Sequence, residues 1–172
     1  MKVLVVVDMQ NDFIDGVLGT PEAQAIVPIV KEKIDNFIQN RGIVIYTRDT
    51  HFDNYLETKE GQYLPVPHCI DKTNGWQIAD GLYRKGCMVA DKFTFGSTWL
   101  PQYILGNYGR VLESIELVGL CTDICVISNA MILKANFPEI PIIVDSSCCA
   151  GVTPESHTRA LEAMKMCQIE VV

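Results

Sequence analysis

One cysteine of the sequence stands where a nucleophile could act. Cys125 follows the apolar run 115–120 after a short turn, and apolar residues at helical spacing begin close to it. A thiol at a helix N-terminus feels the positive end of the helix dipole, which should lower its pKa and favour the thiolate. Backbone N–H groups of the same turn could stabilise an oxyanion, so Cys125 could form an acyl-enzyme. The alternative interpretation is a cysteine that only fills the core.

A nucleophilic thiol needs a base, and Asp8 is the candidate. It ends the apolar run 3–7, and burial raises the pKa of a carboxylate at a strand end, so that it can accept a thiol proton. Lys92, at the end of another expected strand, would hold the carboxylate and the thiolate together. His157 falls in the first turn of an expected helix, which favours a solvated surface position. Asp8 could instead be a structural carboxylate that caps backbone N–H groups.

A second group of polar residues has the composition of a metal site. Asp49 and His51 alternate along an extended segment, so their side chains lie on one side of it, and His68 adds a second imidazole. Histidines and carboxylates suit a divalent ion, zinc first and iron or manganese as alternatives. The competing interpretation is a polar cluster without metal.

These residues lie at the ends of short apolar runs that alternate with amphipathic stretches. The pattern predicts helices at 26–38, 100–105 and 123–135, and a further helix that starts at 153–155. Between 52 and 80 the periodicity fails, which predicts a long loop. The expected strands cover residues 3–7, 43–47, 87–90, 115–120, 142–145 and 169–172.

Strands separated by helices predict an α/β fold, in which one mainly parallel six-stranded sheet has helices on both faces. A chain of 172 residues is long enough for one core, so we expect a single domain over 1–172. Ligands of such sheets bind beyond the carboxyl ends of the strands. The reactive side chains named above all fall at those ends, and this convergence is the functional signal.

Composition limits the partners. The net charge of −7 argues against nucleic acid and against an anionic membrane surface, which both need clustered Lys and Arg. No apolar run reaches the roughly 18 residues of a membrane-spanning helix, and no signal peptide is evident. Seven cysteines without a regular framework favour a reducing, cytoplasmic location. We therefore expect a small-molecule partner.

Five ordered motifs together resemble the isochorismatase-like cysteine hydrolases, and within them the nicotinamidases most. The resemblance covers nearly the whole chain. Its motifs are Val-Val-Asp8-Met-Gln10-Asn-Asp-Phe13, Thr-Arg-Asp49-Thr-His51, Pro-His68-Cys, Lys92 before Phe-Thr-Phe-Gly-Ser, and Gly119-x-x-x-Asp123-x-Cys125-Val.

The resemblance implies a catalytic triad of Asp8, Lys92 and Cys125. It also implies a cis peptide before Cys121 and an oxyanion hole formed by the backbone N–H groups of Cys121 and Cys125. Relatives with the Asp-x-His motif hold a divalent metal that binds the pyridine nitrogen of nicotinamide, and they form oligomers. A homo-oligomer is therefore expected here.

The same resemblance implies that Asp49, His51 and His68 are metal ligands, but many nicotinamidases carry another histidine soon after this motif. Here the loop offers only acids for that role. We expect Glu60 to be the fourth ligand, because Gly61 follows it and would allow a sharp turn. Glu57 is the reserve, and the alternative is a solvated Glu60.

In the proteins that the chain resembles, an aromatic residue is often found three positions before the second histidine, here His68. This chain has Pro65 at that position, so an aromatic wall that stacks on the substrate ring must come from elsewhere. We expect Phe13, Gln10, Phe95 and Trp99 to line the substrate pocket, with Trp76 as a further source of the wall.

The sequence thus predicts a metal-dependent amidohydrolase that converts nicotinamide and water to nicotinate and ammonia through a thioester. Alternatives are another C–N hydrolase of the superfamily acting on a carbamoyl or ureido compound, and a catalytically silent binding protein of the same fold.

Overall fold

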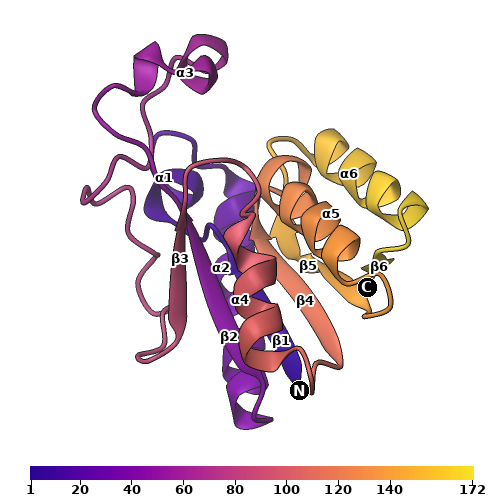
Figure 1. Ribbon diagram of the computed structural model, residues 1–172. Coiled ribbons are helices and arrows are strands. Elements are labelled where there is room, and N and C mark those ends of the chain that lie inside the picture. The colour runs from indigo at the N-terminus through magenta and orange to yellow at the C-terminus, as the bar shows by residue number, and fades with distance from the viewer.

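The computed structural model describes residues 1–172 and contains a single six-stranded sheet (Figure 1). Its order is β3-β2-β1-β4-β5-β6, and every neighbouring pair is parallel. The expected parallel α/β sheet is therefore confirmed. The strands are β1 (Lys2–Val7), β2 (Ile43–Asp49), β3 (Met88–Lys92), β4 (Ser114–Leu120), β5 (Ile142–Ala150) and β6 (Glu170–Val171).

Strand β1 lies inside the sheet because its side chains are apolar on both faces. Val3, Val5 and Val7 pack into one core with residues of α4 (Trp99–Tyr108), α5 (Ile127–Asn136) and α6 (Pro154–Met166). Leu4 and Val6 pack on the other face against α1 (Asn11–Ile14) and α2 (Pro21–Gln39). A strand buried on both faces reads as a continuous apolar run, as this one does.

Several boundaries differ from those that the sequence pattern predicts. Strand β3 begins and ends later than expected, so Lys92 is its last residue, and β5 runs five residues further, to Ala150. The helix after β4 opens as a π-helix, η2 (Thr122–Val126), before α5. The segment 52–80 is not all loop: it contains η1 (Tyr55–Glu57) and α3 (Lys59–Tyr63), which are too short for an apolar period.

Sheet topology decides where a site can form. From β1 the chain passes to β2 and β3 on one side, and then crosses to β4, β5 and β6 on the other. A crevice forms beyond the carboxyl ends of the strands where the direction of winding reverses, here between β1 and β4. In Figure 1 this edge is at the top, where α3 stands beyond the sheet. No helix of the chain has the length and apolarity to cross a membrane.

Candidate active site and metal cluster

The turn that carries Cys125 begins with a close approach of two strands. Gly119 has a φ of 117°, and a Cβ there would lie 2.1 Å from the backbone oxygen of Val7, so only glycine fits. The peptide between Leu120 and Cys121 is cis, as the family resemblance implied. The chain then enters η2, whose fourth residue is the buried Cys125.

Asp8 directly follows β1 and is fully buried. Its φ of 46° is left-handed, a conformation that aspartate tolerates better than most residues, and it turns the carboxylate across the end of β2. The Thr47 hydroxyl donates a hydrogen bond of 2.6 Å to Asp8 Oδ1. Asp8 Oδ2 lies 2.6 Å from Lys92 Nζ, in a buried ion pair.

The Lys92 ammonium joins three groups. Besides Asp8 it lies 3.1 Å from Asp49 Oδ1 and 3.4 Å from Cys125 Sγ, and its side chain is 1% exposed. The structure therefore brings Asp8, Lys92 and Cys125 together, as the sequence predicted, and connects them to Asp49. A buried ammonium between two carboxylates is compensated, which is the condition for keeping it charged there.

The electrostatics of the thiol differ from the sequence prediction. Burial and the nearby Asp8 carboxylate raise the pKa of Cys125 well above its usual value, although the Lys92 charge acts in the opposite direction. The sequence prediction considered the helix dipole, which favours the thiolate, whereas desolvation by burial acts in the opposite direction. Burial also raises the pKa of Asp8 against the effect of Lys92, which makes this carboxylate a stronger base than an exposed aspartate.

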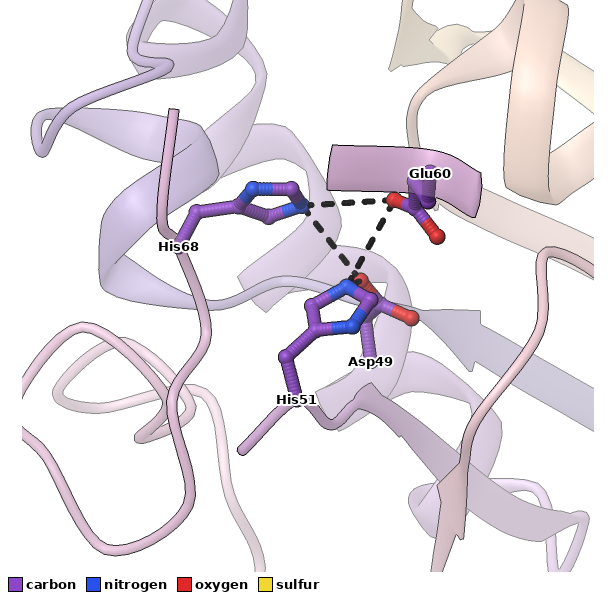
Figure 2. Close-up of side chains that lie close together, drawn as sticks. All are labelled: Asp49, His51, Glu60 and His68. Atoms are coloured by element: carbon purple, nitrogen blue, oxygen red, sulfur yellow. Dashed lines mark hydrogen bonds and ion pairs between the residues drawn. The ribbon is translucent and has the colours of Figure 1, made fainter. Parts of the chain in front are cut away.

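Four side chains next to this triad point toward a common centre and form the cluster (Figure 2). They are Asp49, His51, Glu60 and His68. They come from the end of β2, from the residues just after it, from α3 and from the loop beyond α3, and their ligand atoms all lie within 4.8 Å of one another. Across the group, Glu60 Oε1 lies 3.5 Å from His51 Nε2 and 3.7 Å from His68 Nε2, and Asp49 Oδ2 lies 3.6 Å from His68 Nε2.

These separations fit a metal ion. Ligands at 2.0–2.2 Å from a tetrahedral zinc lie about 3.4 Å from each other, close to three of the distances above. His51 Nε2 and Asp49 Oδ2 are closer, at 2.7 Å. His68 Nδ1 lies 2.8 Å from the Val66 carbonyl oxygen, which can accept a hydrogen bond from it and leave Nε2 free to ligate. Two imidazoles and two carboxylates form a donor set suited to a divalent cation.

Charges within the cluster are strongly coupled. Burial alone would raise the pKa of Asp49, but the hydrogen bonds to His51 and His68 and the charge of Lys92 lower it far below its usual range. Burial lowers the pKa of His68, yet the hydrogen bonds to Asp49 and to the Val66 backbone outweigh it and raise the pKa overall. Asp49 is thus a carboxylate at neutral pH, the form in which it can ligate a cation.

The sequence offered two acids, Glu60 and Glu57, as the fourth metal ligand, and the structure distinguishes between them. Glu60 belongs to the cluster, whereas Glu57 is exposed and outside it. Gly61 does not have a left-handed backbone, so it does not provide the sharp turn expected from the sequence. Gly61 is needed for space instead: a Cβ there would lie 2.1 Å from the Tyr55 backbone oxygen. The close approach of Gly61 to Tyr55 lets α3 pack against η1, and this packing keeps Glu60 next to His51 and His68.

A cavity of about 690 Å³ opens onto both the thiol and the cluster. Phe13 and Phe95 line it, as predicted, and so do Cys125, Glu60 and His68. Phe13 packs edge-on against the His68 ring, with the ring centroids 5.5 Å apart.

Neither Gln10 nor Trp99, which were both expected in the substrate pocket, lines this cavity. Trp99 lies at the start of α4 and stacks on Tyr103, with a ring separation of 4.7 Å. Gln10 is fully buried: its Oε1 accepts from the Asp49 backbone N–H at 2.7 Å, and its Nε2 donates to the Asp49 carbonyl at 2.9 Å. It therefore holds the backbone of a cluster residue. Trp76, the further source considered, is also outside the cavity.

Two polar side chains near the site were missed by the sequence analysis. Thr47 positions Asp8 through its hydrogen bond. The sequence feature that could have indicated this role is its position two residues before Asp49, on the same face of the strand. Asn129 is fully buried, donates to the Cys125 carbonyl at 2.8 Å and accepts from the Ser97 N–H at 2.9 Å. The sequence feature that could have indicated Asn129 is a polar residue four positions after Cys125, on the same face of the helix.

His157 is not the solvated residue that the sequence suggested. It is half-buried, and its Nδ1 lies 2.7 Å from the hydroxyl oxygen of Thr122, a fully buried residue of the nucleophile turn. Burial lowers the pKa of His157, so a neutral ring faces this hydroxyl at neutral pH. The α6 N-terminus is thereby attached to the turn that carries Cys125.

Comparison with known proteins agrees with this architecture. The isochorismatase domain model matches residues 2–172. The nicotinamidase/pyrazinamidase of Mycobacterium tuberculosis is 26% identical over 197 residues, which cover 100% of this chain and 98% of that protein. The crystal structure of the pyrazinamidase of Pyrococcus horikoshii in complex with zinc has 27% identity and a TM-score of 0.86, and covers 99% of this chain and 98% of that one. N-carbamoylsarcosine amidase from Thermoplasma acidophilum has 26% identity and a TM-score of 0.80, and covers 99% of this chain and 94% of that chain.

Proposed function

Because this chain belongs to the isochorismatase family and is a hydrolase that acts on amides, we propose that its substrate is nicotinamide, hydrolysed to nicotinate and ammonia. The observation that carries the proposal is the position of Lys92 Nζ, within 3.4 Å of Asp8, Asp49 and Cys125. One ammonium thus connects a thiol and its base to a cluster suited to a metal. The relatives named nicotinamidase support the choice of amide.

In the first half of the proposed reaction, Asp8 takes the thiol proton and the Cys125 sulfur attacks the amide carbonyl carbon. Because burial raises the pKa of the Cys125 thiol, this transfer has to accompany the attack. The backbone N–H groups of Cys121 and Cys125 would stabilise the oxyanion. The C–N bond then breaks, the Asp8 proton goes to the leaving nitrogen, and ammonia departs from a thioester.

In the second half, Asp8 removes a proton from water, whose oxygen attacks the thioester carbonyl. The C–S bond breaks, the sulfur recovers the proton from Asp8, and the product acid is released and loses its own proton to solvent to become the carboxylate. Lys92 keeps its charge throughout and stabilises whichever partner is anionic. A divalent metal, with zinc as the first candidate, would be held by the side chains of Asp49, His51, Glu60 and His68. When bound, it supplies a Lewis acid for the ring nitrogen of the substrate.

Ammonia release from a panel of amides tests the proposal. The panel contains nicotinamide, pyrazinamide and N-carbamoyl amino acids, each assayed with zinc and after chelation. The likeness to N-carbamoylsarcosine amidase makes a carbamoyl compound the second candidate. Turnover of carbamoyl compounds alone would transfer the function to that class. No turnover, together with a Cys125 thiol that no alkylating agent modifies, would indicate a silent binding protein.

A further inference from the structure

Large apolar side chains gather where the cavity opens. They are exposed by 38–90% although they line the same cavity as Cys125, and they are Tyr63, Leu64, Phe93, Phe95 and Val152, which we call the apolar collar. Phe52, itself 52% exposed, extends it by stacking on Phe93, with the ring centroids 5.8 Å apart. Single exposed apolar residues are ordinary, but five that line one cavity mark a binding surface.

The collar comes from three places in the chain. Tyr63 ends α3 and Leu64 follows it, Phe93 and Phe95 follow β3, and Val152 follows β5. These are the segments that carry or adjoin the proposed ligand Glu60, the ammonium of Lys92 and the nucleophile turn. A molecule held by the catalytic groups would therefore have the collar at its outer end.

The cavity is larger than the proposed substrate needs. Volumes of about 300–1000 Å³ hold drug-sized ligands, and this cavity measures about 690 Å³, whereas nicotinamide is a single pyridine ring with one amide group. The charged side chains that line the cavity are Asp49, Lys59, Glu60 and, when protonated, His68, all members or neighbours of the cluster. The collar itself offers carbon surface and the Tyr63 hydroxyl.

We propose that the apolar collar binds a hydrophobic substituent on the substrate, so that the enzyme also hydrolyses heteroaromatic amides bulkier than nicotinamide, and with a higher kcat/KM. The inference rests on the proposed amidase function and adds the class of substituent. A second copy of the chain could also cover exposed apolar residues. The substituent is favoured because Tyr63, Leu64, Phe93 and Phe95 line the concave cavity itself and not only the surface around it.

The test compares kcat/KM for nicotinamide with that for nicotinamides carrying a methyl or phenyl group at each free ring carbon. At least one phenyl derivative should be preferred by about tenfold or more, since even one methylene in an apolar pocket changes kcat/KM by about that factor. Phe93→Ser and Leu64→Ser should reduce this preference severalfold. The control is Leu105→Ser, at a leucine on α4 outside the cavity that is 63% exposed, close to the 60% of Phe93; it should leave the preference unchanged.

The outcomes separate this inference from the proposed function. Turnover of nicotinamide with every substituent tolerated equally or worse, in the same ratios for the wild type and Phe93→Ser, would overturn the collar while leaving the amidase intact. Absence of turnover on every amide would overturn both. If Phe93→Ser and Phe52→Ser change the solution mass and not the substrate preference, the collar is an interface between copies and the inference is wrong.

Discussion

Replacing Asp8 with asparagine removes the proposed base and keeps the size of the side chain. The Thr47 hydroxyl can still donate to the amide oxygen of the new residue, so the turn after β1 keeps one of its contacts. The new side chain lacks the negative charge 2.6 Å from Lys92 Nζ, and it cannot accept the thiol proton. Asp8→Asn therefore separates the loss of the base from the loss of side-chain packing better than Asp8→Ala would.

The expected loss has a catalytic and a stability part. General bases contribute about 10²–10⁴-fold, so kcat should fall by that factor, equivalent to about 3–5 kcal/mol of activation free energy. Breaking a buried ion pair costs about 3–5 kcal/mol of folding stability when the partner is left uncompensated. Lys92 keeps Asp49 at 3.1 Å, so we expect a destabilisation at or below about 3 kcal/mol.

Two assays separate these parts. Ammonia release gives kcat, and the rate of iodoacetamide alkylation of Cys125, followed by intact mass, reports the thiol directly. Asp8→Asn should slow both, and combining it with Lys92→Met should lose little more than the worse single variant, because the two residues act as one unit. Asp145→Asn is the matched control: it also breaks an ion pair, of 2.7 Å, but far from the thiol, and should keep normal turnover. An Asp8→Asn thiol that alkylates at the wild-type rate would refute the assignment.

Three further predictions follow from the site and the sheet. Cys125→Ala should lose essentially all ammonia release while Cys167→Ala, at an exposed thiol, keeps it; near wild-type activity of Cys125→Ala would exclude the thioester. Glu60→Gln should weaken zinc binding in a calorimetric titration by more than about tenfold, whereas the matched change Glu57→Gln should not; the reverse result would move the ligand role. Burial raises the pKa of Asp145, but Lys33 and the hydrogen bonds from Ser147 together outweigh burial and lower the pKa overall, so this carboxylate stabilises the fold above about pH 4 and the contribution disappears as pH falls further. Asp145→Asn should lower Tm by at most about 3 °C at pH 7 and by less at pH 3; an undiminished difference at pH 3 would contradict this sign.

Much of the site could be predicted because strand ends are visible in the sequence. Asp8, Asp49 and Cys125 each follow or end an apolar run, and a parallel sheet places such ends at one edge. Lys92 was predicted as a residue after a strand and proved to be the last residue of β3, a difference that leaves it at the same edge. An error of two residues at the end of this strand therefore leaves Lys92 in the predicted site.

What could not be predicted depends on contacts between segments far apart in the chain. Gln10 is polar and lies two residues after Asp8, so it was assigned to the pocket, yet its amide binds the backbone of Asp49. The pKa of Cys125 was predicted from the helix dipole alone, whereas complete burial decides its direction. The use of Gly61 depends on the approach of Tyr55, which no local pattern reveals.

The thiol centre and the cluster are parts of one arrangement, because Asp49 serves both. Its Oδ1 lies 3.1 Å from Lys92 Nζ, and its Oδ2 lies 2.7 Å from His51 Nε2. Asp49 and Lys92 are paired residues of neighbouring parallel strands, so their side chains share one face of the sheet. A slip of one residue in this register would turn the Lys92 side chain to the opposite face, away from both carboxylates and from Cys125. The pairing of β2 with β3 therefore determines whether base, thiol and cluster meet.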